Sequence, residues 1–388
     1  MGAAATLTHH VRTRQAAMST ARWRFALVLG GGGTKGLAHV GVLRALEERG
    51  WIPDVVIGNS IGALVAAAWA VEFTVAELEA VALSMRRRDI FAIARGDMAA
   101  RRFRAPGLYK SEPLEMLLKG LLGDTTFEEL PRRLVVASVD INSGMVLYFG
   151  LPGLRDVPVA DAVFASCALP GFFAPREIGG RFLVDGALAD NLPVGLAGGQ
   201  GMDGVVAVDV GSSSVLRAEV QESGFAAVFA RASEIVFHQM LENDLAHWAG
   251  PAMLLIQPRV EHVPMLSFAN NRELIDEGYR ATVAALDQAA DQVRHAAGGI
   301  FPRREVEVRV DRERCIGCGA CVVLAPPGTF RMDAAGKAVG PERPQEWSPI
   351  SGGFIRHCPT YAITARPTRP AAGAPTGGAS RGTARARA

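Results

Sequence analysis

The sequence predicts an α/β protein with a three-layer α/β/α domain around a mostly parallel sheet, followed by a small α+β domain. Two observations lead to this prediction. Short apolar segments alternate with segments of helical periodicity along most of the chain, and four of the five cysteines lie in its last fifth. Strands alternating with helices are typical of a sheet covered on both faces, and clustered cysteines without a secretion signal are typical of a metal centre.

The alternation runs from about residue 22 to residue 298. The predicted strands are short runs rich in Val, Leu, Ile and Phe. They are Arg24–Leu29, Val55–Ile57, Leu134–Val139, Phe182–Val184, Val205–Val210 and Met253–Ile256. The predicted helices repeat apolar residues every three or four positions. They are Lys35–Arg49, Ile61–Val71, Glu112–Leu122, Gly224–Asp244 and Arg272–His295.

These patterns divide the chain into four parts. Residues 1–21 form a flexible leader, 22–298 the α/β domain, 304–366 a small domain that carries the cysteines, and 367–388 a disordered tail. The leader has no apolar core of a signal peptide, and the tail is Ala, Pro, Gly, Thr and Arg with little to bury. Either Met1 or Met18 can be the natural start.

Composition restricts the partners of this protein. The chain has 388 residues, is 49% hydrophobic and carries a net charge of +2, so it can build a large core and is not expected to bind nucleic acid. No apolar run is long enough to span a bilayer, so we expect any membrane contact to be peripheral. The unpaired cysteine cluster and the missing secretion signal favour the cytoplasm, at most at the inner face of the membrane.

A candidate nucleophile stands between a predicted strand and a predicted helix. Residues 58–62 read Gly-Asn-Ser-Ile-Gly. A serine at such a sharp turn exposes its Oγ, flanking glycines let the backbone close, and the free amides of the helix start face the reacting centre. The motif by itself also fits an ordinary Gly-rich turn, but its position favours Ser60 as a nucleophile.

A glycine-rich turn precedes that motif. Residues 30–36 read GGGGTKG, and consecutive glycines let backbone amides converge on an anion. A dinucleotide phosphate would need an acidic residue at the end of the next strand, whereas Asp54 precedes that strand. A P-loop would need Ser or Thr after Lys35, where Gly36 stands. The pattern therefore favours the oxyanion of an acyl-transfer reaction.

A third motif, Asp185-Gly186-Ala187, follows the predicted strand at 182–184. An Asp-Gly pair is also a common plain turn. Asp140 and Asp209 likewise follow apolar strands, so the pattern alone does not choose among the three aspartates.

In this order, the three motifs resemble those of the patatin-like phospholipase family. The family's glycine-rich loop is similar to residues 31–36, its nucleophile elbow to 58–62 and its Asp-Gly motif to 185–187. Two further stretches, 165–175 (ASCALPGFFAP) and 185–193 (DGALADNLP), also resemble family segments. The resemblance covers about residues 22–298. Lys35 stands where plant members usually carry Arg.

The resemblance implies a Ser–Asp dyad without a catalytic histidine, in which Ser60 is the nucleophile and Asp185 the base. Main-chain amides would hold the oxyanion, and water would hydrolyse the acyl-enzyme. The implied substrate is a phospholipid, a lysophospholipid or another fatty-acyl ester. The implied oxyanion residues are Gly31, Gly32, Gly33 and Ile61, and the implied supporting glycines are Gly36, Gly58, Gly62 and Gly186.

Two alternatives remain open. An α/β-hydrolase would use a Ser–Asp–His triad, and His238, His247 and His262 follow Asp185 in the required order. No histidine stands directly before the glycine run, however, as the HGGG-type lipase motif would have, and the glycines lie too close in sequence to the elbow. The other alternative is a redox-linked protein whose hydrolase fold only binds an acyl ligand.

The cysteines predict an iron–sulfur site. Cys315, Cys318 and Cys321 form C-x2-C-x2-C, and Cys358-Pro359 supplies a remote fourth thiolate. This spacing lets three thiolates wrap one cluster. Zinc is the competing ligand, but zinc sites usually combine two C-x2-C pairs.

Residues 304–366 resemble single-cluster bacterial ferredoxins. Ala325 occupies the position at which relatives with two clusters carry a further cysteine, so the resemblance implies one 4Fe-4S cluster. Its role as an electron carrier for a redox partner, a redox regulator or a structural element remains open at this point.

Overall fold

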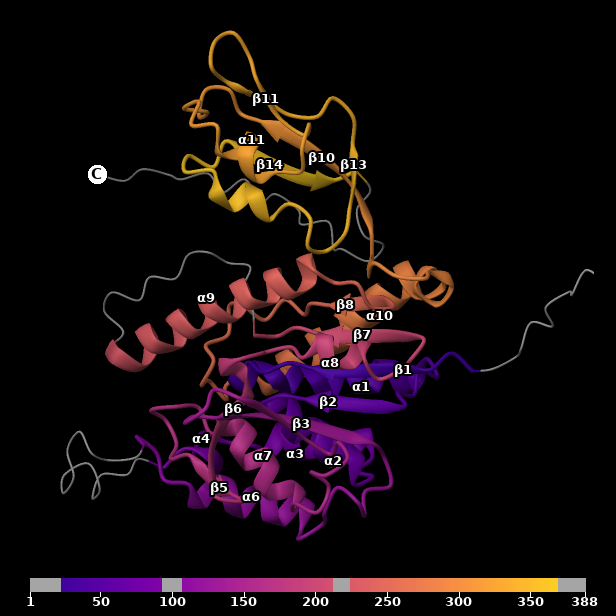
Figure 1. The fold of residues 1–388 in the computed structure, drawn as a ribbon, viewed down its shortest axis with the longest axis vertical. Coiled ribbons are helices and arrows are strands. Elements are labelled where there is room, and N and C mark those ends of the chain that lie inside the picture. Colours follow the sequence, from indigo (N-terminus) through magenta and orange to yellow (C-terminus); the bar gives the residue numbers. More distant parts are fainter. Residues whose placement is uncertain (1–21, 93–106, 212–223, 369–388) are drawn as a thin grey trace, which may run out of the picture.

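The computed structural model describes residues 22–92, 107–211 and 224–368 (Figure 1). The predicted leader and nearly all of the predicted tail lie outside these residues. The described chain has the predicted three-layer α/β/α domain and, after it, the small α+β domain. No helix of the described residues is long and apolar enough to cross a membrane.

A nine-stranded sheet forms the centre of the large domain, with the strand order β5-β6-β3-β2-β1-β7-β8-β9 and with β4 paired to β3. Strands β3, β2, β1, β7, β8 and β9 run parallel, whereas β4, β5 and β6 add antiparallel pairs at one side. The strands are β1 Phe25–Leu29, β2 Val55–Gly58, β3 Leu134–Asp140, β4 Val146–Phe149, β5 Arg176–Ile178, β6 Arg181–Asp185, β7 Gly204–Val208, β8 Ala252–Ile256 and β9 Ile300–Phe301.

Side-chain alternation along the strands explains the two helical layers. In β1, Phe25, Leu27 and Leu29 belong to the larger of two apolar clusters, and Ala26 and Val28 belong to the other. Successive side chains of a strand point to opposite faces, so both faces are buried. The larger cluster contains residues of α1 Ala38–Glu48, α2 Ile61–Ala70, α3 Val75–Ser84, α4 Arg87–Ile90, α6 Glu112–Leu122, α7 Val159–Cys167 and α10 Asn271–His295. The other contains residues of α8 Val194–Gly198 and α9 Gly224–Ala246.

The small domain has its own core. Strands β10 Arg304–Val310, β13 Gln345–Trp347 and β14 Ile363–Pro367 form a three-stranded antiparallel sheet. A further strand pair, a short helix and a 3-10 turn complete it: β11 Arg331–Met332, β12 Ala338–Val339, α11 Ala320–Leu324 and η4 Gly353–His357. Phe330, Phe354 and the strand residues Val306 and Val308 pack in a separate apolar cluster. In Figure 1 this domain lies against α9, and β9 extends the large sheet to Phe301, beyond the predicted limit at 298.

The predicted strands and helices are present, with one local difference. The helix predicted from Lys35 begins as the 3-10 turn η1 (Gly33–Leu37), and α1 follows it. Helix α3 was missed, although Thr74 and Glu77 form a capping box that could have indicated its start. Helix α7 was also missed, because its Ala-rich stretch has little amphipathic pattern.

Candidate active site

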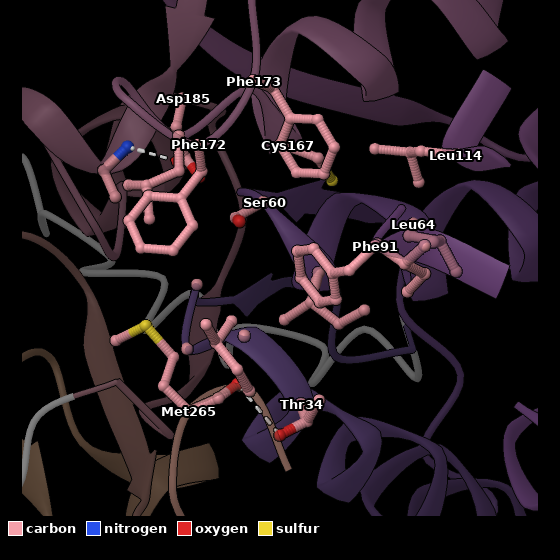
Figure 2. A pocket seen from close by; sticks show the side chains of 18 of the residues that line it. Thr34, Ser60, Leu64, Phe91, Leu114, Cys167, Phe172, Phe173, Asp185 and Met265 are labelled. Atoms are coloured by element: carbon pink, nitrogen blue, oxygen red, sulfur yellow. Dashed lines mark hydrogen bonds between the residues drawn. The ribbon is translucent and has the colours of Figure 1, made fainter. Parts of the chain in front are cut away.

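An apolar cavity lies at the carboxyl ends of β1, β2 and β6. Ser60, Asp185 and the glycine-rich turn line it (Figure 2). The remaining wall is almost entirely hydrophobic and includes Leu64, Phe91, Leu114, Phe172, Phe173, Phe237, Met265 and Phe268. A wall of this composition suits the apolar part of a ligand.

Ser60 occupies a strained turn between β2 and α2. Its φ of 53° and ψ of −127° place a non-glycine residue in a region that L-residues avoid. A Cβ at Gly62 would overlap the carbonyl oxygen of Leu29, and one at Gly58 would overlap the backbone of Ala63. The two glycines therefore let the turn close, as the motif predicts, and the serine hydroxyl points into the cavity (Figure 2).

A buried polar network supports the turn from below. The Ser60 amide donates to Ser166 Oγ at 2.8 Å, and the Ser166 hydroxyl donates to Asn59 Oδ1 at 3.3 Å. Asn59 and Ser166 are fully buried. Sequence analysis did not assign them a role, although both lie inside matched motifs. Together they hold the backbone of Ser60 in its unusual conformation.

Asp185 ends β6 and is only 3% exposed. Burial raises the pKa of its carboxyl to about 7, although hydrogen bonds from the Ala187 amide, at 2.9 Å, and from the Ser60 side chain oppose the rise. The two side chains are therefore within hydrogen-bond reach. A carboxyl group with a pKa near neutrality can accept and return a proton at physiological pH.

The other two strand-end aspartates have different surroundings. Asp140 accepts hydrogen bonds from Ser143 and Asn142 in the turn after β3. Asp209 accepts from the Gly211 amide and from Gln257. The cavity wall includes Asp185 and neither of these two. The tertiary structure therefore selects Asp185 as the aspartate that lies beside Ser60.

The glycine-rich turn runs beside Ser60, but its amides are not equivalent. The Gly31 amide donates to the Asn191 carbonyl at 3.3 Å. In the part of the chain that the structure describes, the amides of Gly32, Gly33 and Ile61 donate none of the backbone–backbone hydrogen bonds found outside regular helices and strands. A Cβ at Gly36 would overlap the Ile61 side chain, so this glycine lets η1 and α2 approach each other. The amides of Gly32, Gly33 and Ile61 therefore remain candidate oxyanion donors.

Two basic residues beneath the turn were not assigned a role from sequence. His39 is fully buried, and burial lowers its pKa to about 4, so the ring is neutral. Its Nε2–H then donates to the Gly30 carbonyl at 2.8 Å. Lys35 is 2% exposed, and its Nζ lies 2.7 Å from Glu234 Oε1 of α9. A buried charge needs such a partner, so the ion pair fixes the position of η1 against α9.

The histidines of the triad alternative do not line the cavity. His247 and His262 are exposed and bind the Asn243 carbonyl and Glu273, respectively. His238 is buried on α9, with Nε2 3.2 Å from Glu242 Oε1. Cys167 does line the cavity beside Ser60, and burial raises the pKa of its thiol, so it stays protonated.

The four terminal cysteines line a second, smaller cavity. The positive φ of 74° at Gly317 and Gly319 lets the chain curl between the first three. The Ala338 amide donates to Cys315 Sγ at 3.5 Å and the Ala362 amide to Cys358 Sγ at 3.3 Å. Hydrogen bonds from backbone amides to sulfur stabilise thiolates and tune the reduction potential of iron–sulfur clusters.

Electrostatics around Cys358 favour the thiolate form. Burial acts to raise the pKa of Cys358, but hydrogen bonds from Ala362 and Thr360 outweigh it and lower the pKa. No His, Cys, Asp or Glu side chains of the described residues are grouped as ligands of a single metal ion. In a cubane cluster each thiolate would bind a different iron, so such ligands need not meet around one metal ion. The donor set fits a 4Fe-4S cluster.

Two segments of the chain match known protein families. Residues 27–197 match the model of the patatin-like phospholipase family, and residues 308–348 match a 4Fe-4S single cluster domain. The large domain belongs to the patatin-like phospholipase family. The chain is therefore a patatin-like domain fused to a single-cluster iron–sulfur domain, although Cys358 lies after the matched residues.

Several relatives share the large domain. An uncharacterised NTE family protein of Mycobacterium tuberculosis is 32% identical over 190 residues, which are 49% of this chain and 50% of the relative. A second one from the same species is 30% identical over 69% of this chain and 47% of the relative. Lysophospholipase NTE1 of Meyerozyma guilliermondii is 28% identical over 65% of this chain and 18% of the relative. The chain spans about half the length of the first of these curated relatives.

Among solved structures, the crystal structure of VipD from Legionella pneumophila aligns with a TM-score of 0.44 and 17% identity, covering 73% of this chain and 72% of that one. The ExoU–SpcU complex of the type III secretion system of Pseudomonas aeruginosa aligns with a TM-score of 0.38 and 17% identity, covering 70% of this chain and 52% of that one.

Proposed function

We propose that this protein is a serine acyl hydrolase that cleaves fatty-acyl esters of the phospholipid or lysophospholipid type, with Ser60 as nucleophile and Asp185 as base. The observation that carries the proposal is the placement of a strained serine beside a buried carboxyl group of near-neutral pKa in an apolar cavity. The relation to lysophospholipases supports the substrate class.

In the first half-reaction, Asp185 accepts the proton of the Ser60 hydroxyl while Oγ attacks the ester carbonyl. The developing oxyanion accepts hydrogen bonds from the amides of Gly32, Gly33 and Ile61. The neutral carboxyl of Asp185 then gives the proton to the departing alcohol. The strained φ of Ser60 aims Oγ at the carbonyl without a conformational change on binding.

In the second half-reaction, Asp185 takes a proton from water while the water oxygen attacks the acyl-enzyme carbonyl, and the same amides hold the oxyanion. The bond between the acyl carbon and Ser60 Oγ then breaks, Asp185 returns the proton to Ser60 Oγ, and the fatty acid leaves. The aromatic and aliphatic walls surround the acyl chain and keep bulk water away. Such a substrate is presented by a lipid surface, so the proposal includes peripheral contact with a membrane from the cytoplasmic side.

The proposal includes one 4Fe-4S cluster held by Cys315, Cys318, Cys321 and Cys358. When bound, such a cluster supplies one-electron redox chemistry and cross-links the small domain. No step of ester hydrolysis requires it. The cluster would exchange electrons with a redox partner, report the redox state or stabilise the domain.

The test combines a fluorophosphonate probe with hydrolysis of a panel of acyl esters, using anaerobically purified full-length protein. We expect Ser60→Ala to abolish labelling and hydrolysis, and Asp185→Asn to abolish hydrolysis. Ser143→Ala and Asp140→Asn are matched controls from the turn after β3 and should retain activity. Wild-type activity in Ser60→Ala would refute the proposed function.

A further inference from the structure

Helix α9 lies between the large domain and the small domain (Figure 1). It packs on the sheet through Leu241 and Leu245, and Ile350 of the small domain contacts the same apolar cluster. Its polar side chains also bind a residue of each functional region, so the helix contacts both sites of the chain.

The first contact reaches the glycine-rich turn. Glu234 Oε1 lies 2.7 Å from Lys35 Nζ, and its other oxygen accepts from Arg231 at 3.1 Å. Lys35 belongs to η1, the same short turn that begins at Gly33. One helical turn beyond Glu234, Phe237 forms part of the cavity wall. Helix α9 therefore contacts both the glycine-rich turn and the cavity.

The second contact reaches the cysteine cavity. Glu242 Oε1 accepts a hydrogen bond from Arg356 Nη1 at 3.0 Å. Arg356 lies in η4, which Cys358 follows directly. A Cβ added at Gly353, at the start of η4, would lie 3.1 Å from Glu242 Oε1. Arg356 therefore links the segment that leads into Cys358 to helix α9.

The two contacts lie on one face of α9. Glu234, His238 and Glu242 are spaced four residues apart, and side chains at this spacing form one row on a helix. His238 is buried between the two acidic residues. A rigid helix with anchors in one row transmits a shift or rotation from one end of the row to the other.

We propose that helix α9 positions the glycine-rich turn for oxyanion binding, and that Glu234 does so through its ion pair with Lys35. In this proposal the small domain fixes the position of α9 through the contact between Arg356 and Glu242. This inference rests on the proposed hydrolase function. Because Lys35 is buried, separating its ammonium group from Glu234 would leave an unpaired buried charge, which is unfavourable. Displacement of α9 therefore moves η1, and oxyanion stabilisation is sensitive to displacements below 1 Å.

The first experiment tests Lys35 and Glu234 by separating kcat from KM. We expect Lys35→Met and Glu234→Gln to lower kcat about tenfold to a hundredfold, because one lost oxyanion donor lowers it by about 10²–10³. KM should change less than about threefold, since the apolar wall binds substrate in the ground state. Lys35→Arg keeps the charge and should restore kcat to within about threefold. A merely structural role would not give this rescue together with an unchanged KM.

Protein folding is controlled separately. Thermal unfolding is followed for each variant, and the double variant Lys35→Met/Glu234→Gln leaves no unpaired charge between the two positions. The folded double variant should show the same lowered kcat as Lys35→Met. A folded double variant with wild-type kcat would overturn the positioning role.

The second experiment tests the link between the domains with a matched pair of arginines. Arg356 lies two residues before Cys358, and Arg314 lies one residue before Cys315 but pairs with Asp311 inside the small domain. Arg356→Gln should lower kcat about threefold to tenfold, whereas Arg314→Gln should change it less than twofold. Iron content and the visible absorption spectrum should be unchanged in both variants.

Glu242→Gln completes a double-mutant cycle. If Arg356 and Glu242 act only through their contact with each other, the double variant Arg356→Gln/Glu242→Gln should lower kcat no further than Arg356→Gln alone. Equal kcat in Arg356→Gln and Arg314→Gln would overturn the link between the domains. A wild-type protein that neither reacts with the fluorophosphonate nor hydrolyses any ester would instead refute the proposed function, so the two failures are distinguishable.

Discussion

The two sites of this chain are assembled in different ways. The cysteine cavity takes three of its four thiols from one seven-residue stretch, and its shape follows from two glycines in that stretch. The candidate active site takes its residues from the turns after β1 and β2, from β6, and from several helices that include α7 and α9, which together extend over more than half of the chain. A local site depends on backbone conformation, whereas a dispersed site depends on the sheet that brings its parts together.

The largest expected effect tests whether the dispersed site acts as one unit. If Ser60 and Asp185 act together, each single variant should lose activity by about 10³-fold or more, and Ser60→Ala/Asp185→Asn should be no worse than the more damaging single change. Steady-state hydrolysis of a fluorogenic acyl ester measures the three rates. Losses that multiply would show that the two residues act independently.

Removal of one thiol tests the independence of the local site. Cys358→Ala should lose most of the iron, because each iron of the cluster needs its own protein thiolate. The large domain should keep its helical circular dichroism signal, since its larger apolar cluster contains no residue of the small domain. Cys167→Ala is the matched control and should retain about four irons per chain. Zinc without iron in the wild type would contradict the assignment of the cluster.

The pKa of Asp185 predicts the pH dependence of the dispersed site. Burial raises this pKa to about 7, and the base must be ionised to accept the Ser60 proton. Single-turnover acylation should therefore increase as pH rises through about 7 and should level off above it. The same shift means that the native state binds a proton more tightly than the unfolded chain, so this group's contribution to stability declines as pH rises from about 4 to 7. An inflection near pH 4 would contradict the buried, neutral-range carboxyl group.

The smallest expected effects concern the histidines outside the cavity. His238→Gln, His247→Gln and His262→Gln should each keep kcat/KM within about tenfold, a barrier change of about 1.4 kcal/mol. Among them, His238→Gln should have the largest effect, because it lies on α9 between Glu234 and Glu242. A loss of several orders of magnitude in one folded variant would favour a triad.

Several features could be predicted from the sequence because they depend on a few adjacent residues. The turn at Ser60 needs glycines on both sides, the glycine-rich turn needs residues without Cβ, and the cysteine loop needs its ligand spacing. The parallel part of the sheet followed from apolar runs separated by helical periodicity. Each of these signals is encoded within one short segment.

Other features were decided only by the tertiary structure. Asp140, Asp185 and Asp209 all follow apolar strands, and only the antiparallel placement of β6 beside β3 brings Asp185 to Ser60. Lys35 finds its counter-ion on α9, far away in the sequence. The physical reason is that burial, and with it the pKa of a carboxyl group or the partner of a charge, depends on which distant segments cover a residue.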